Sequence, residues 1–175
     1  PFSLERTLGC GQAFRWEKVG EWWCGVVGEG VLKVRQTEDS LLFEAYPRSV
    51  GSEFLSGYFR LDDDLPLILS EINRDEHMSV AIKRFYGLRV MRQNPWECLI
   101  SYICATNKNI PAIKKMIANI CERFGEAVEF EGRRFFAFPK PEVLAGASVE
   151  DLRACRLGFR VERVLEASRI VCEGG

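Results

Sequence analysis

A short polar segment, Ala105 to Asn109, joins two apolar stretches of the chain. The amides of Asn107 and Asn109 each offer two hydrogen-bond donors and a carbonyl acceptor, whereas the ammonium group of Lys108 can only donate. This turn is either a simple connector or a set of groups that contacts a polar ligand. The rest of the sequence is needed to decide between these two interpretations.

The histidine and cysteine content leaves few other candidates for chemistry. The only histidine, His77, stands among charged residues and is interpreted as solvated surface, so no histidine is left for a catalytic triad. The seven cysteines are scattered and contain no C-x-x-C pair, which is typical of buried thiols in a reducing compartment. We therefore expect no disulfide, no metal site and no cofactor.

The net charge of −1 conceals an uneven distribution. Residues 38–75 contain nine acidic and three basic residues, whereas residues 76–123 contain eight basic and three acidic residues. The basic part either coats its helices with charge or faces a polyanion. No apolar run approaches the roughly 18 residues of a membrane span, and the first residues do not resemble a signal peptide. We expect an intracellular protein that does not bind membranes.

The polar turn has to be positioned by a strand region and a helical region. Between residues 12 and 46, β-branched and aromatic residues at two-residue spacing alternate with Gly or Asp turns, which predicts an antiparallel meander. From about Glu53 the apolar spacing becomes three and four residues. The apolar residues between Leu65 and Ile72, preceded by Asp62 to Asp64, predict a helix with an acidic start.

Helices are also expected on both sides of the polar turn. Asn94 suits an N-cap, Pro95 the first helical position and Glu97 a capping box. Asn109 is expected to cap the following helix and Gly125 to end it.

The last third of the chain has weaker patterns. Phe130 to Pro141 is interpreted as strand-like or irregular. A short helix is expected from Ser148 to Ala154, and a final helix after a turn at Gly158.

Three segments together resemble the 8-oxoguanine DNA glycosylases of the helix-hairpin-helix superfamily. They are "LERTLGCGQAFRW" (4–16), "YGLRVMRQNPWECLISYICATNKNIPAI" (86–113) and "LRACRLGFRVERV" (152–164). The middle segment is the most specific, whereas the strand entry or a capped helix alone would be a weak signal. The order and spacing of all three agree with the family over nearly the whole chain. Such an enzyme rotates a damaged nucleotide out of the duplex, so it needs a base pocket and groups that occupy the gap.

The resemblance implies a role for two residues in the base pocket. Gly11 matches the glycine whose backbone carbonyl accepts a hydrogen bond from N7–H of the oxidised guanine. Phe14 matches an aromatic residue that stacks on the flipped base. The purely structural alternatives are that Gly11 only forms a turn and that Phe14 only packs in the core.

The resemblance also implies DNA-binding roles for Asn107, Lys108, Asn109, Phe159 and Arg160. Asn107 matches the asparagine that reaches the vacated space, with Lys108 and Asn109 beside it in the same polar turn. Phe159 matches a tyrosine wedge in the base stack, and Arg160 matches an arginine that holds the estranged cytosine. Ala112 stands where eukaryotic members have a second cytosine-reading arginine, so selectivity for the opposite base is expected to be relaxed.

The catalytic groups of the family match no residue of this sequence. Its helix-hairpin-helix, Schiff-base lysine and aspartate would follow Gly175, and no lysine occurs after Lys140. We therefore expect no catalytic residue within residues 1–175, and we expect this chain alone to be inactive.

We predict an α+β fold with an antiparallel β domain at residues 1–58 and a helical glycosylase domain at 59–175, truncated before the helix-hairpin-helix. The whole protein is expected to be a monomeric base-excision repair enzyme, a DNA glycosylase and AP lyase that acts on double-stranded DNA containing 8-oxoguanine, in the cytoplasm, nucleoid or nucleus. The alternatives are an alkylated-base DNA glycosylase and a non-catalytic fragment that binds DNA or a protein.

Overall fold

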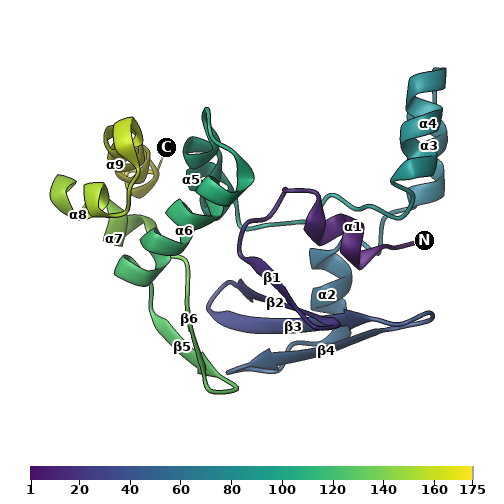
Figure 1. The fold of residues 1–175 in the computed structure, drawn as a ribbon, viewed down its shortest axis with the longest axis horizontal. Helices are drawn as coiled ribbons and strands as arrows, with labels where there is room; N and C mark the ends of the chain where they lie inside the picture. Colours follow the sequence, from purple (N-terminus) through teal and green to yellow (C-terminus); the bar gives the residue numbers. More distant parts are fainter. Residues whose placement is uncertain (175) are drawn as a thin grey trace.

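The computed structural model describes residues 1–174 as an α+β fold in which a sheet lies beside a helical region (Figure 1). The sheet pairs β1 (Trp16–Val19), β2 (Trp22–Val27), β3 (Gly30–Gln36) and β4 (Leu41–Tyr46) in sequence order, all antiparallel. Gly20 and Gly28, both with φ 61°, form the tight turns before β2 and β3. The predicted class and the predicted meander are confirmed.

Two helices, α1 (Leu4–Gly9) and α2 (Ser52–Tyr58), cover the sheet and share its apolar core (Figure 1). The strand register places Trp16 opposite Gly25. A Cβ atom at Gly25 would lie only 2.4 Å from the Trp16 ring, so the ring can occupy its site only over a glycine. Trp16 also donates a hydrogen bond from Nε1 to the Tyr58 hydroxyl at 3.1 Å, which ties β1 to α2.

The helices α3 (Leu65–Ile72) and α4 (Glu76–Arg84) stand away from the rest of the molecule (Figure 1). Asp64 caps α3 by accepting a hydrogen bond from the Leu67 amide at 3.0 Å, and Asp75 caps α4 in the same way. The helix predicted from apolar spacing is therefore confirmed as α3. No residue of α4 is buried, so this helix has no buried apolar stripe that a sequence pattern would reveal.

The helices α5 (Pro95–Ala105) and α6 (Ile110–Phe124) flank the polar turn. The predicted N-caps are confirmed: Asn94 accepts from the amides of Trp96 and Glu97, and Asn109 caps α6. The predicted capping box is wrong. Glu97 turns away from the helix end and pairs with Arg15 at 3.1 Å, because a guanidinium from the segment before β1 offers a charged partner.

A β-hairpin follows α6, made of β5 (Ala127–Phe130) and β6 (Arg133–Phe136). Its two-residue turn, Glu131 and Gly132, has φ 51° and 70°, the geometry of a type I′ hairpin turn. Gly125 does cap α6, but with extended backbone instead of the left-handed conformation common at such caps. Glycine is required there because a Cβ atom would lie 2.0 Å from the Ala137 carbonyl oxygen.

The chain then forms α7 (Pro141–Ala145), α8 (Val149–Ala154), the 3-10 helix η1 (Gly158–Arg160) and α9 (Val161–Cys172). Ser148 caps α8 as predicted, by accepting a hydrogen bond from the Asp151 amide at 3.1 Å. These helices share one core with α5 and α6, which includes Ile100, Cys104, Ile117, Ile120, Leu152 and Val164.

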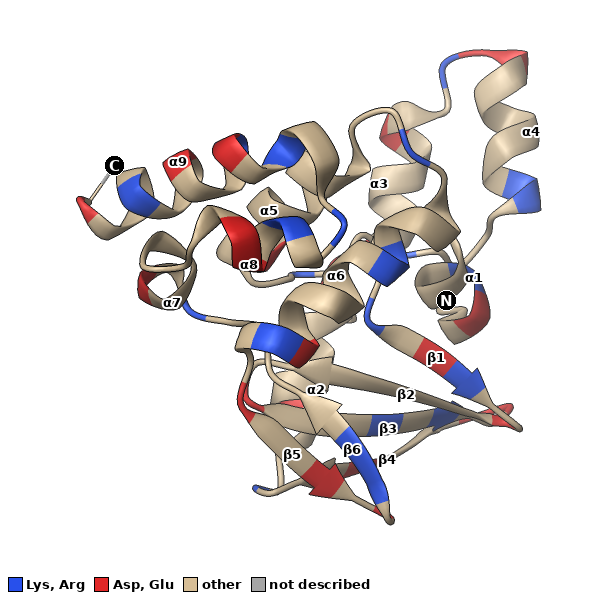
Figure 2. Ribbon diagram, turned by 60° about the vertical axis from the view of Figure 1, so that its left-hand side comes forward, with Lys and Arg blue, Asp and Glu red and all other residues tan. Residues whose placement is uncertain are grey.

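Charges of both signs are mixed along α9, and acidic β5 lies beside basic β6 (Figure 2). Part of the basic excess of residues 76–123 is neutralised, since Arg92 pairs with Asp62 at 2.9 Å and Arg123 pairs with Asp151. Within residues 1–174, Lys108 and Lys115 have no recorded ion pair. Their charges face solvent and are available to a polyanion.

The described chain offers neither a membrane span nor an evident metal site. No helix in residues 1–174 is both long enough and apolar enough to cross a bilayer. The seven cysteines are free thiols, and the same residues contain no cluster of His, Cys, Asp or Glu suited to a metal ion.

Candidate nucleic-acid interface

The polar turn between α5 and α6 is exposed to solvent from Thr106 to Asn109. Asn107 has φ 53°, a left-handed conformation that asparagine tolerates better than most residues. Asn107 and Lys108 are exposed, and the Lys108 amide closes the turn on the Ala105 carbonyl at 3.2 Å. The Asn109 side-chain oxygen accepts from the Ala112 amide at 3.0 Å. Its carbonyl group is thus engaged in capping α6, while its amide group remains a donor.

Gly11 lies against the start of α6. Its φ of +86° belongs to the region that favours glycine, and a Cβ atom there would lie 2.9 Å from Ile110 Cδ1. The loop that contains Gly11 therefore approaches the residue that follows the polar turn. Any other residue at this position would strain the backbone as well as crowd Ile110.

Phe14 is partly buried against the core of the helical region. It lines an open cavity of about 330 Å³ together with Lys114, Ile117, Ala118, Cys121, Glu122 and Phe136. The lining also includes Arg15 and Val26, so the cavity combines two aromatic rings with residues from the middle of α6. Lys114 donates to the Trp16 carbonyl at 3.3 Å, which holds this face of α6 to the start of β1.

A buried ion pair holds the segment that contains Phe14. The side chains of Arg15 and Glu97 are only 7% and 17% exposed, and Arg15 also donates to the Phe136 carbonyl. Burial raises the pKa of Glu97, and the adjacent guanidinium opposes that shift. Sequence reasoning missed this pair because its members are far apart in the chain and no local pattern links them.

The turn before α9 presents an exposed aromatic ring. Gly158 has φ 61°, and Phe159 is 59% exposed. The guanidinium carbons of Arg160 and Arg163 lie 4.2 and 5.6 Å from the centre of the Phe159 ring. An apolar ring held out by cationic neighbours is suited to insertion between the bases of a polyanion.

Arg160 lies inside the protein, in contrast to the exposed position expected of a base reader. It is only 2% exposed and donates to the Leu157 carbonyl at 3.1 Å and to the Thr106 carbonyl. Its Nε atom has no hydrogen-bond partner within the described residues. The guanidinium is buried because it donates to the Thr106 carbonyl at the end of α5 and to the Leu157 carbonyl at the start of η1, a meeting of distant segments that a sequence pattern cannot reveal.

The three sequence segments meet at the turn between α5 and α6. Gly11 reaches Ile110 at one end of the turn, and Arg160 reaches Thr106 at the other. The exposed amide of Asn107, the charge of Lys108 and the Phe159 ring are thus carried by connected segments. This combination of a polar group, a cation and an apolar wedge suits a distorted nucleic-acid duplex.

The fold is that of DNA glycosylases. The solved 3-methyladenine DNA glycosylase of Archaeoglobus fulgidus matches 95% of this chain with a TM-score of 0.75 at 22% identity, a likeness of fold alone. Residues 1–99 match the family described as 8-oxoguanine DNA glycosylase, N-terminal domain. The chain therefore belongs to that family.

Two relatives are more similar than the archaeal enzyme. The Clostridium acetobutylicum 8-oxoguanine glycosylase/lyase, solved with double-stranded DNA containing cytosine opposite 8-oxoG, has a TM-score of 0.91 and 31% identity over 99% of this chain and 60% of its own. The N-glycosylase/DNA lyase of Saccharomyces cerevisiae is 30% identical over 95% of this chain and 48% of its own length. The chain thus spans about half to three fifths of these relatives.

Proposed function

We propose that this chain is part of a base-excision repair enzyme, a DNA glycosylase and AP lyase that flips 8-oxoguanine out of duplex DNA and removes it. The observation that carries the proposal is the meeting of Gly11, the polar turn and the Phe159 turn around the start of α6. Family membership and the clostridial complex with damaged DNA support it. The protein would act as a monomer on double-stranded DNA inside the cell.

Gly11 and Phe14 are proposed to receive the flipped base. Guanine N7 is a hydrogen-bond acceptor, whereas the oxidised base carries a proton on N7, so a backbone carbonyl at Gly11 would favour only the damaged base. The positive φ of Gly11 supports this role, because glycine adopts this conformation at little cost. The cavity beside Phe14 offers a ring face for stacking.

The vacated space in the duplex is proposed to receive Asn107 and Phe159. The exposed amide can meet an orphaned base edge, the ring can stack in the gap, and Lys108 and the Asn109 amide can contact phosphate. Arg160 could reach an estranged cytosine only by leaving the carbonyls of Thr106 and Leu157. Reading of the opposite base by Arg160 would therefore require a local rearrangement of its side chain.

Excision itself requires a nucleophile, which the family resemblance assigns to a lysine amine with an assisting aspartate. The amine would attack the sugar C1′ as the bond to the base breaks, and the resulting imine would permit elimination of the 3′ phosphate. None of residues 1–175 matches either group. We propose that these residues supply recognition and flipping, while the whole protein performs the chemistry.

Equilibrium binding tests the proposal directly. The chain is titrated, at one fixed salt concentration, with three duplexes that differ only in one base pair. This pair is 8-oxoguanine with cytosine, 3-methyladenine with thymine, or guanine with cytosine. We expect the tightest binding to the 8-oxoguanine duplex. Preference for the alkylated base would favour the alternative glycosylase, whose fold this chain shares. Equal affinity for all three would indicate a fragment that binds DNA without recognising damage.

A further inference from the structure

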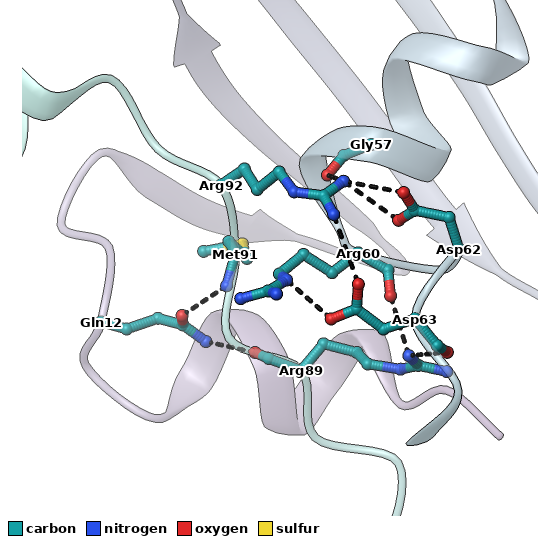
Figure 3. A network of polar contacts seen from close by, with 8 residues as sticks. All are labelled: Gln12, Gly57, Arg60, Asp62, Asp63, Arg89, Met91 and Arg92. Carbon is teal, nitrogen blue, oxygen red and sulfur yellow. Dashed lines mark hydrogen bonds and ion pairs between the residues drawn. The ribbon is translucent and has the colours of Figure 1, made fainter. Parts of the chain in front are cut away.

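Gln12, the residue after Gly11, has all the polar groups of its side chain engaged with backbone. Its amide nitrogen donates to the Thr7 carbonyl at 3.0 Å. The same nitrogen donates to the Arg89 carbonyl at 2.7 Å, and the side-chain oxygen accepts from the Met91 amide at 2.9 Å (Figure 3). The partners come from α1 and from the extended segment that precedes α5. One side chain therefore fixes the loop of Gly11 to two separate parts of the chain.

The backbone on both sides of this loop is held in the same way. The Gln12 carbonyl accepts from the side-chain amide of Gln93 at 2.8 Å. The Thr7 hydroxyl, in a fully buried residue, accepts from the Arg89 amide at 3.1 Å. Hydrogen bonds from side chains therefore join the loop of Gly11 to the segment before α5, in place of bonds between the two backbones. The position of the loop depends on these few residues.

The segment that receives Gln12 is itself anchored. Arg89 is 6% exposed and donates to the carbonyls of Arg60 at 2.8 Å and Asp63 at 3.0 Å. Arg92 pairs with Asp62 at 2.9 Å and with Asp63 at 3.3 Å (Figure 3). The network extends from Gln12 to the loop after α2, so the partners of Gln12 have little freedom to move.

We propose that Gln12 is a positioning residue, which holds the Gly11 carbonyl in the orientation that separates oxidised from normal guanine. This inference rests on the proposed function of Gly11. The discrimination depends on one hydrogen bond from N7–H, and a single hydrogen bond is directional. A glycine at φ +86° allows the backbone conformation that this loop requires. It does not hold the backbone in that conformation, since glycine is the most flexible residue. Gln12 supplies the rigidity.

Two substitutions at Gln12 separate the effect of its hydrogen bonds from the effect of its side-chain volume. Gln12→Met keeps an unbranched side chain of similar length and removes the hydrogen bonds to Thr7, Arg89 and Met91, together with the weaker contact of the amide with the Cys10 sulfur at 3.3 Å. Gln12→Glu keeps the acceptor for the Met91 amide and replaces the donor that faces Thr7 and Arg89 with an oxygen. The matched control is Gln36→Met, because Gln36 also joins two backbone groups, the Leu4 amide at 2.7 Å and the Phe2 carbonyl at 2.9 Å, at the start of α1.

The measurement is the ratio of dissociation constants of this chain for duplexes with guanine and with 8-oxoguanine opposite cytosine, at fixed salt. Thermal unfolding is recorded for each variant. We expect the ratio to fall about tenfold in Gln12→Met, which corresponds to about 1.4 kcal/mol, and to fall also in Gln12→Glu. Gln36→Met should keep the wild-type ratio even where its melting temperature falls.

The outcomes distinguish failure of the role of Gln12 from failure of the proposed function on which that role depends. A wild-type ratio near one would overturn the proposed function and this inference with it. A wild-type preference for damage that persists in Gln12→Met would overturn only the role of Gln12. If Gln12→Met does not fold, Gln93→Met, which removes only the bond to the Gln12 carbonyl, should lower the ratio to a smaller extent, and an unchanged ratio would count against the proposal.

Discussion

Gly11 and Ile110 lie so close that a Cβ atom at Gly11 would be 2.9 Å from Ile110 Cδ1, although one residue precedes the sheet and the other begins α6. The contact joins the proposed base pocket to the polar turn. This point is therefore where the two segments can influence each other.

Gly11→Ala should cost about 1–2 kcal/mol of unfolding free energy, because an alanine side chain is strained at φ +86°. Ile110 is 45% exposed and its Cδ1 atom can move, so the backbone should account for most of the loss. Urea unfolding of Gly11→Ala with and without Ile110→Val, which removes Cδ1, separates the two causes. If the double variant regains most of the lost unfolding free energy, contact with Ile110 Cδ1 is the main cause of the loss. Gly9→Ala, at an open position in α1, is the control and should be nearly neutral.

Asn107→Ala should weaken binding to the 8-oxoguanine duplex while changing unfolding free energy by less than about 1 kcal/mol, because an exposed turn amide contributes little to folding. The control is Asn107→Gly, which removes the same amide but accepts φ 53° without strain. Both variants should lose the same affinity in a fluorescence anisotropy titration. Affinity that Gly retains and Ala loses would indicate that only the backbone conformation of the turn matters.

Phe159→Ala should weaken DNA binding about equally whichever base lies opposite the lesion, because a wedge stacks without reading hydrogen-bonding groups. Stability should change by less than about 0.5 kcal/mol for a ring that is 59% exposed. Phe85, which is 50% exposed and is the C-cap of α4, provides a matched Phe→Ala control outside the proposed interface. Equal losses of DNA affinity in Phe159→Ala and Phe85→Ala would argue against a specific wedge at Phe159.

Arg160→Ala should destabilise the fold and also reduce the difference between cytosine and adenine opposite the lesion. Removal of the guanidinium leaves the Thr106 and Leu157 carbonyls without this donor, at a cost of about 1–3 kcal/mol. Binding is measured with each of the four opposite bases at one salt concentration. A uniform loss for all four would restrict Arg160 to a structural or phosphate-neutralising role. Arg160→Lys keeps the charge and removes the planar fork, and it should lose discrimination more than stability.

The 175-residue chain should form no borohydride-trapped adduct with an 8-oxoguanine duplex. Lys114 is the lysine that lines the cavity beside Phe14, and its amine is engaged by the Trp16 carbonyl at 3.3 Å. Trapping followed by peptide mapping is the measurement. An adduct on Lys114, or on any lysine within the chain, would contradict the assignment of the nucleophile to a group outside these residues.

Local rules predicted much of the secondary structure. The caps at Asn94, Asn109 and Ser148 were predictable because each depends on contacts within three residues of the helix start. The capping box failed at Glu97 because a distant guanidinium competes for the same carboxylate. The division of the chain at residue 58 stays a prediction, although the sheet core includes Met91 from well beyond it.

The candidate site is partly visible in the sequence. Glycine and asparagine at positions 11 and 107 indicate backbone geometry that few residues tolerate, and both have positive φ. The burial of Arg160 and the contacts of Gln12 depend on which segments meet in three dimensions. The DNA-contacting roles of the proposed residues stay predictions until binding is measured.

The pairing of Trp16 with Gly25 has a consequence for how the sequence of this chain can change. Since the indole occupies the volume that a Cβ atom at Gly25 would need, neither position can change size alone. Over generations the two codons are expected to vary together or not at all, although Gly25 lies within the sheet and outside every proposed contact with DNA. A mutation at Gly25 is expected to displace Trp16, which lies two residues from Phe14, and so to disturb the proposed base pocket from a distance. In a genetic screen it would then look like a recognition defect.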